Sequence, residues 1–197
     1  MIIERADADD LGVILALRTE ASEWLAQRGI DQWAVAWPNP EEQNRRILGS
    51  IEAGETWMVR DENEATMATL ALDTFSDPRL WTPEEQADPA MYMHRLIVRR
   101  KHAGLGTEIM DWACHRAHRL GLHWLRIDVW TDNTGLHNYY LHNGFKHVRT
   151  LDLADYPSGA LFQRSTIQAA SSGVRMAARY ASGSPSSASS RGNKSSL

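Results

Sequence analysis

Two glycines, Gly104 and Gly106, stand between an apolar extended run at residues 91–98 and a segment at residues 104–120 whose apolar side chains recur at helical spacing. A strand that passes directly into a helix predicts a sheet covered by helices. The first N–H groups of a helix have no partner inside the helix, and residues without a Cβ let the backbone close around a small anion. The junction therefore predicts either a phosphate-binding turn or a tight turn without a ligand.

Strand and helix patterns alternate along the chain up to residue 164, in the order βααβββαβαββ. The expected strands are residues 1–4, 56–60, 65–73, 91–98, 123–130, 145–153 and 160–164, and the expected helices are residues 7–28, 40–54, 104–120 and 134–142. An irregular, proline-rich link is expected at residues 73–89. This order predicts an α/β fold of the mixed α+β type, with helices on both faces of one sheet.

The chain divides into a folded part and a tail. Residues 1–164 suit one domain, whereas residues 165–197 are rich in serine and nearly free of large aliphatic side chains, which predicts a disordered, basic tail. The tail holds four of the 21 Lys and Arg residues and none of the 25 acidic residues, so residues 1–164 carry 17 basic against 25 acidic groups, or −8. An acidic body of this kind predicts no binding to nucleic acid. It either attracts a cationic small molecule or is simply a solvated surface.

The chain shows no sign of export or membrane insertion. Its longest apolar runs are only a few residues, and its first residues lack the pattern of a secretory signal. The single cysteine, Cys114, cannot form an internal disulfide, which agrees with a reducing compartment. A cytoplasmic location without a membrane partner is therefore expected. The assembly state stays open, with a homodimer as one alternative.

A second motif follows the glycine junction. At residues 125–145 a strand ends in a loop with Asn133, and a helix then begins that closes with Tyr140, Gly144 and Phe145. Together the two segments resemble the GNAT superfamily of acyl-CoA-dependent N-acetyltransferases. The resemblance implies a mixed, mostly antiparallel, twisted sheet flanked by helices. It also implies acetyl-CoA as co-substrate, bound through its pyrophosphate and pantetheine by the first segment.

The resemblance assigns a set of residues to acetyl-CoA. They are Leu96, Ile97, Val98, Ala103, Gly104, Leu105, Gly106, Thr107, Glu108, Asn133 and Tyr140. When the family's phosphate-binding motif is aligned by its usual spacing from Val98, Ala103 takes the position where the family has Gln or Arg. Glu108 then takes the last position of the motif, where the family has a small residue. If Glu108 points inward, its carboxylate repels the phosphates by about 1 kcal/mol. If it points to solvent, it favours the helix dipole.

Acetyl transfer to an amine requires a neutral nucleophile. An amine with a pKa of about 10.4 is neutral in about one molecule in 10^3.4 at pH 7, so its deprotonation costs about 4.6 kcal/mol of free energy. His94 is the first candidate for the base and Asp128 the second, each with a structural alternative. Tyr140 is the candidate that stabilises the departing thiolate, in preference to its neighbour Tyr139, because its spacing from Gly144 matches the motif.

Three tryptophans surround the junction of the first two expected helices, where acceptor substrates of this family lie. Trp24, Trp33 and Trp37 could line an amine site through cation–π contacts, or they could be core residues. No metal site is expected, because no Cys or carboxylate completes a cluster with the histidines. The sequence thus predicts an N-acetyltransferase that moves acetyl from acetyl-CoA to a small primary amine by direct attack in a ternary complex. The alternative is a non-catalytic module that binds an acyl-CoA or another ligand.

Overall fold

The computed structural model describes residues 1–34 and 39–167. Trp37 and the expected tail from residue 168 onward therefore lie outside the described residues. The folded part continues slightly past the expected boundary at residue 164, because Ser165 belongs to the last strand and Thr166 is fully buried. The Thr166 hydroxyl donates hydrogen bonds to the carbonyls of Leu122 and His123, at 2.8 and 3.1 Å.

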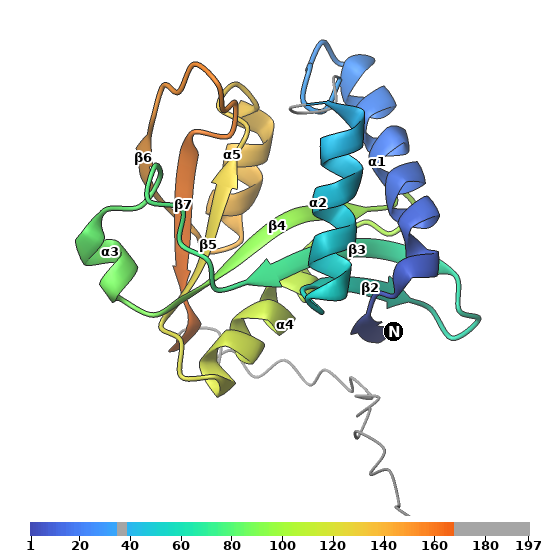
Figure 1. Cartoon of the computed structure of the whole chain (residues 1–197), viewed down its shortest axis with the longest axis horizontal. Coiled ribbons are helices and arrows are strands. Elements are labelled where there is room, and N and C mark those ends of the chain that lie inside the picture. Colours follow the sequence, from blue (N-terminus) through green and yellow to red (C-terminus); the bar gives the residue numbers. More distant parts are fainter. Residues whose placement is uncertain (35–38, 168–197) are drawn as a thin grey trace, which may run out of the picture.

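The structure is a seven-stranded mixed sheet flanked by helices, which confirms the predicted fold class (Figure 1). Its elements in chain order are β1 (Ile2–Arg5), η1 (Ala8–Asp10), α1 (Leu11–Ala26), α2 (Pro40–Glu52), β2 (Thr56–Arg60), β3 (Thr66–Asp73), α3 (Pro83–Ala87), β4 (Ala90–Val98), α4 (Leu105–Arg119), β5 (Trp124–Val129), α5 (Thr134–His142), β6 (Lys146–Thr150) and β7 (Ala160–Ser165). Apart from the short helices η1 and α3, this is the expected order.

The sheet order is β1-β2-β3-β4-β5-β7-β6, and β4 and β5 are its one parallel pair of neighbours. They pair over three residues, from Ala90 opposite Trp124 to Tyr92 opposite Arg126. Both strands then continue, to Val98 and Val129, without further pairing to each other in the described structure. The sheet is therefore open between the carboxyl ends of β4 and β5.

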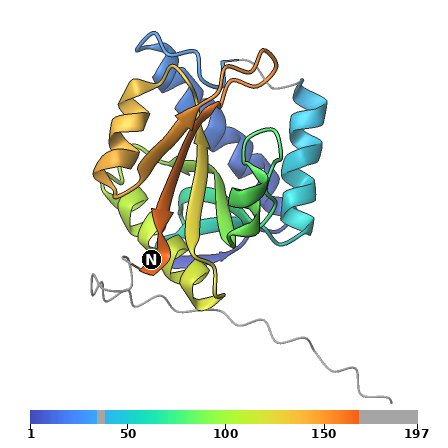
Figure 2. The same cartoon turned by 90° about the vertical axis from the view of Figure 1, so that its left-hand side faces the viewer.

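The two faces of the sheet carry different helices, because side chains alternate along each strand. Trp57 and Val59 of β2 pack in the core cluster that includes α4, whereas Met58 between them packs with α1 and α2. Figure 1 shows α1 and α2 side by side on one face and α4 on the other. In β7, Phe162 packs with Tyr140 of α5, whereas its neighbour Leu161 packs with the segment before α3. Figure 2 shows α5 and α3 on opposite sides of the sheet.

Helix α4 forms because its apolar residues recur on one face. Ile109, Met110, Ala113 and Ala117 are fully buried, and burial of each larger side chain stabilises the fold by about 1.5–3 kcal/mol. The helix begins after Gly104, whose φ of 89° is in the left-handed region that glycine adopts without strain. The expected glycine turn therefore leads directly into a helix fixed by the core.

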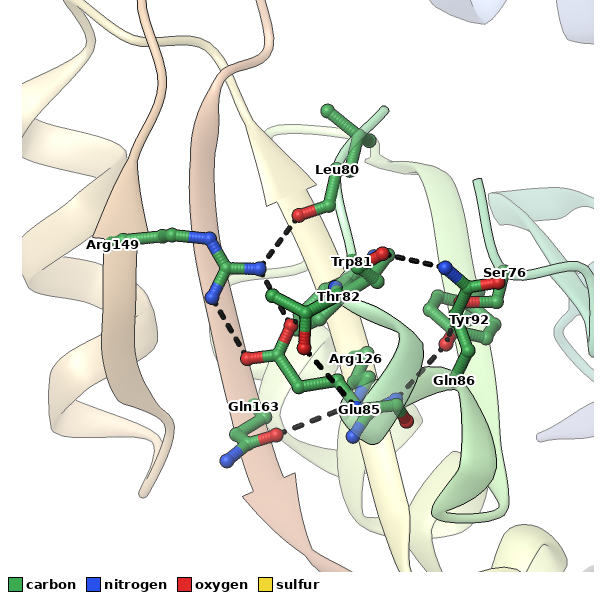
Figure 3. Close-up of polar contacts among 10 residues, drawn as sticks. All are labelled: Ser76, Leu80, Trp81, Thr82, Glu85, Gln86, Tyr92, Arg126, Arg149 and Gln163. Atoms are coloured by element: carbon green, nitrogen blue, oxygen red, sulfur yellow. Dashed lines mark hydrogen bonds and ion pairs between the residues drawn. The ribbon is translucent and has the colours of Figure 1, made fainter. Parts of the chain in front are cut away.

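Helix α3 is a correction to the irregular link expected at residues 73–89. It begins with a capping box, in which the Thr82 side chain accepts from the Glu85 N–H and the Glu85 carboxylate accepts from the Thr82 N–H, with Pro83 in the first turn. Figure 3 shows how the helix is held on the sheet: Glu85 pairs with Arg149, and Arg126 donates to the Glu85 carbonyl at 2.6 Å. The Thr-Pro-Glu-Glu pattern was the available signal for this helix.

Candidate active site

A cleft of about 1150 Å³ opens where β4 and β5 separate. It reaches from the N-terminus of α4 to the face of the sheet covered by α1 and α2. Among the residues assigned to the cofactor, Leu96, Ile97, Val98, Ala103, Gly104, Gly106, Asn133 and Tyr140 line it. The structure thus brings eight of the eleven assigned residues to a single cleft.

The other three assigned residues point elsewhere. Leu105 is buried in the core, and Thr107 and Glu108 are exposed. Leu105 and Glu108 border a separate surface hollow next to Asp61 and Lys101. Of the two orientations considered for Glu108, the structure therefore has the outward one, in which the carboxylate favours the helix dipole and faces away from the cleft.

The glycine turn presents free backbone donors to the cleft. Within the described residues, the N–H groups of Ala103, Gly104 and Gly106 make no hydrogen bond to the backbone, whereas that of Leu105 donates to the His102 carbonyl at 3.2 Å. Free N–H groups at the start of a 15-residue helix form a site that suits a phosphate. The turn has the geometry that the sequence predicted for an anion-binding site.

Two arginines beside this turn were not among the predicted residues. Arg99 and Arg100 follow β4 directly and line the cleft, and Arg99 is paired with Glu20 at 3.0 Å. Their guanidinium groups add positive charge next to the free N–H groups of the glycine turn. The Arg-Arg-Lys run at residues 99–101 was the signal in the sequence that would have indicated them.

Tyr140 and Tyr139 occupy different places. Tyr140 is buried, contacts Phe145 edge to face with ring centroids 5.3 Å apart, and lines the cleft. Its hydroxyl has no hydrogen-bond partner among the described residues. Burial, together with the nearby charge of Asp128, raises the pKa of Tyr140 above its usual value, so the hydroxyl keeps its proton at neutral pH. It is a free hydrogen-bond donor that faces the cleft.

Tyr139 lies at the glycine turn instead. Its hydroxyl fills the space above Gly106, so that a Cβ at position 106 would overlap with it and would contact Val98 at 3.8 Å. A side chain at position 106 would therefore require the Tyr139 hydroxyl to move, even before any ligand binds. The part of the α5 motif that approaches the glycine turn is Tyr139, whereas Tyr140 lies deeper in the cleft.

The two candidate bases are neighbours in the structure. His94 of β4 lies between two carboxylates, with Nε2 3.3 Å from Asp73 Oδ2 and Nδ1 3.3 Å from Asp128 Oδ1. Tyr156, from the loop between β6 and β7, donates its hydroxyl hydrogen to Asp128 Oδ2 at 2.7 Å. Three strands, β3, β4 and β5, thus supply an ion-paired cluster at the edge of the cleft.

This cluster changes the protonation of His94. Burial disfavours the imidazolium, but the hydrogen bonds and charges of Asp128 and Asp73 outweigh it and raise the pKa of His94 to about 10. Burial would raise the pKa of Asp128, but its bonds to His94 and Tyr156 lower it below the usual range. In the free protein at neutral pH, His94 is therefore a cation between two carboxylates and has no lone pair to accept a proton.

Of the three aromatic residues assigned to the acceptor, Trp24 and Trp33 lie within the described residues, and the contacts of Trp24 differ from those expected. Trp24 lines the cleft, but its two nearby cations are already in the protein: the guanidinium carbons of Arg28 and Arg100 lie 3.7 and 3.3 Å from its ring centroid. Trp33 also lines the cleft, and its carbonyl accepts from Ser22 at 3.1 Å. The cation–π contacts expected for an acceptor amine at Trp24 are thus made by arginines.

Asn133 joins two parts of the cleft wall. Its side-chain oxygen accepts from the Leu136 N–H at 3.0 Å and so caps the start of α5. Its Nδ2 donates to Gln32 Oε1 at 2.7 Å, and both side chains are buried. Asn133 therefore ties the loop after α1 to the start of α5, a contact that the sequence did not predict.

No helix in residues 1–34 and 39–167 has the length and apolar character needed to cross a bilayer. In the same part of the chain, no group of three or more His, Cys, Asp or Glu side chains is arranged to hold a metal ion.

Comparison with known proteins identifies the family. Residues 16–145 match the family model described as the acetyltransferase (GNAT) family. The chain is 29% identical over 149 residues to the uncharacterized N-acetyltransferase YesJ of Bacillus subtilis (strain 168), over 71% of this chain and 78% of that protein.

Solved structures share the fold. A GNAT-family acetyltransferase from Listeria monocytogenes 4b F2365 superposes with a TM-score of 0.65 at 23% identity, over 83% of this chain and 94% of the other. N-acetylglutamate synthase from Neisseria gonorrhoeae, complexed with coenzyme A and N-acetyl-glutamate, has a TM-score of 0.57 at 17% identity, over 83% of this chain and 34% of the other. With the family model covering most of the domain, the chain belongs to the GNAT family of acetyltransferases.

Proposed function

We propose that this protein transfers an acetyl group from acetyl-CoA to the primary amine of a small molecule, by direct attack in a ternary complex. One observation carries the proposal. The gap between β4 and β5 places the free N–H groups of the glycine turn and the unpaired Tyr140 hydroxyl in the same cleft. A phosphate site and a donor for a leaving group are the two features that acyl transfer from CoA requires.

The residues suggest how acetyl-CoA would be held. The N–H groups of Ala103, Gly104 and Gly106 would bind the pyrophosphate, and Arg99 and Arg100 would offset its charge. The unpaired edge of β4 beyond Tyr92 would accept the pantetheine arm, because its backbone groups on that side have no strand partner. The thioester would then lie toward His94 and Tyr140.

The chemical step needs one bond to form and one to break. The lone pair of the acceptor nitrogen attacks the thioester carbonyl, the carbon–sulfur bond then breaks, and CoA leaves as a thiolate. The Tyr140 hydroxyl is a donor for that thiolate. Because the pKa of Tyr140 is raised while a thiol has a pKa of about 8.5, hydrogen bonding is favoured over full proton transfer.

The nitrogen must also lose a proton, and His94 remains the predicted base with Asp128 as its alternative. An ammonium group placed beside Asp128 would compete with His94 for the same carboxylate and would thereby lower the pKa of His94. The base role then applies to the ternary complex rather than to the free protein, in which the pKa of His94 is about 10.

The acylation assay measures release of the CoA thiol with a panel of primary amines, and mass spectrometry identifies the acetylated product. We expect turnover with at least one amine and none without an acceptor. A thermal shift provides the matching binding test, since acetyl-CoA at 100 times its Kd stabilises by about 2.7 kcal/mol. Stabilisation by acetyl-CoA without turnover of any amine would favour the alternative, a non-catalytic acyl-CoA-binding module.

A further inference from the structure

Arg95 is a second cation beside the His94 cluster, and no acidic side chain among the described residues pairs with it directly. It sits in a bulge of β4: Ala71 pairs with His94 and Thr69 pairs with Ile97, so β4 has one residue more than β3 in this stretch. Arg95 takes a φ of 50°, which is uncommon for a residue with a side chain. The bulge turns its side chain out of the regular alternation, and Arg95 lines the cleft.

The guanidinium group of Arg95 has no hydrogen bond and no ion pair within residues 1–34 and 39–167. Burial lowers its pKa, against the charges of Asp73 and Glu55. The other arginines of the cleft differ, since Arg99 pairs with Glu20 and Arg100 lies on Trp24. A half-buried cation with five free donors and no partner is costly in the empty protein, and an anionic ligand would remove that cost.

The position of Arg95 indicates which ligand it would serve. The charge of Asp73 acts on Arg95, and Asp73 also belongs to the cluster around His94. The glycine turn, where the phosphates of CoA would bind, begins beyond the end of β4 at Val98. Arg95 therefore lies at the end of the cleft near His94, where the acceptor would bind. At this end, carboxylates that could bind an ammonium group lie near a guanidinium group that could bind an anion.

We propose that the acceptor is an amino acid, whose carboxylate binds to Arg95 while its amino group lies beside Asp73 and Asp128. A carboxylate matches the planar fork of a guanidinium group in a two-point contact. The inference rests on the proposed acetyl transfer for its chemistry, but the carboxylate contact itself is a matter of binding and is measured without turnover.

The test compares each amino acid with its own decarboxylated amine: phenylalanine with phenethylamine, lysine with cadaverine, and glutamate with 4-aminobutyrate as a shifted-carboxylate case. Calorimetry with the CoA-loaded protein measures binding, and CoA release measures turnover. For at least one amino acid, we expect binding about 10- to 100-fold tighter than for its decarboxylated partner, the range of a charge-assisted contact. Arg95→Gln should abolish that preference, and Arg95→Lys should restore only part of it.

Arg45→Gln is the matched control, because Arg45 is on the outer side of α2 with a side chain that is 79% exposed. Thermal melting checks that each variant is folded. The inference is overturned if no amino acid binds, if the wild type favours the decarboxylated amines, or if Arg95→Gln keeps the preference. It is also overturned if Arg95→Gln weakens CoA itself tenfold, because Arg95 would then serve the cofactor. If the preference depends on Arg95 but no product forms, the carboxylate site stands and the proposed transfer fails.

Discussion

Replacing His94 by Gln should destabilise the protein by an amount that falls as the pH rises. In the folded protein the imidazolium of His94 lies 3.3 Å from a carboxylate oxygen of Asp73 and 3.3 Å from one of Asp128. Glutamine is similar in size but carries no charge, so it leaves two carboxylates facing each other without a cation between them. The cost of the substitution therefore depends on whether the histidine would have been protonated.

The size of the expected destabilisation follows from the pKa of His94. A rise from the ordinary 6.5 to about 10 corresponds to an upper limit of about 5 kcal/mol in the free energy of unfolding. The His94 side chain is 29% exposed, and solvent reduces this figure. We expect a loss of about 2–3 kcal/mol at pH 6.

The direction with pH follows from the raised pKa of His94. The folded protein holds the His94 proton more tightly than the unfolded chain, so the stabilisation is complete below pH 6.5, declines as the pH rises, and is lost near pH 10. Groups that do not contact this cluster titrate alike in both proteins, so they cancel in the difference between wild type and variant.

The measurement is urea unfolding followed by tryptophan fluorescence at pH 6, 8 and 10. His123→Gln is the control, because His123 forms an exposed pair with Asp88 at 2.7 Å and a pair of this kind contributes about 0.2–1 kcal/mol. A His94→Gln difference that is equal at the three pH values, or that grows toward pH 10, would refute the assignment of an imidazolium between two carboxylates.

Three further substitutions test other parts of the structure. Gly106→Ala should weaken binding of CoA at least tenfold by calorimetry, either because the added Cβ blocks the phosphate or because it displaces the Tyr139 hydroxyl. In the second case, adding Tyr139→Phe restores part of the affinity. An unchanged Kd for Gly106→Ala would contradict both explanations. Tyr140→Phe should lower kcat about 10²-fold with little change in KM for acetyl-CoA, while Tyr139→Phe alone has a much smaller effect on kcat. Full activity of Tyr140→Phe would exclude a role of the Tyr140 hydroxyl in stabilising the departing thiolate. Glu85→Gln should destabilise the protein by about 1–3 kcal/mol in urea unfolding, because it removes the carboxylate paired with Arg149. No change would mean that the charge of this pair contributes nothing to holding α3 on the sheet.

The local pattern of the sequence was sufficient for the strands, the longer helices and the glycine turn. Hydrophobic periodicity identified the strands and the longer helices, because the burial of one face dictates a period of two or 3.6 residues. Gly104 and Gly106 marked the start of α4, because the left-handed φ of Gly104 and the close approach of Tyr139 each suit a residue without a side chain. The five-residue α3 was missed in spite of its capping box, because so short a helix has little periodicity.

The end of the cleft around His94 depends on the tertiary structure. Asp73, His94 and Asp128 come from three different strands, so neither their contact nor the raised pKa of His94 follows from any local pattern. The separation of β4 from β5 is likewise a property of strand pairing, which joins residues far apart in the chain. Sequence periodicity also assigns a strand residue to one face only, whereas a bulge in β4 brings Arg95 into the cleft, and a bulge appears only when β4 is paired with β3.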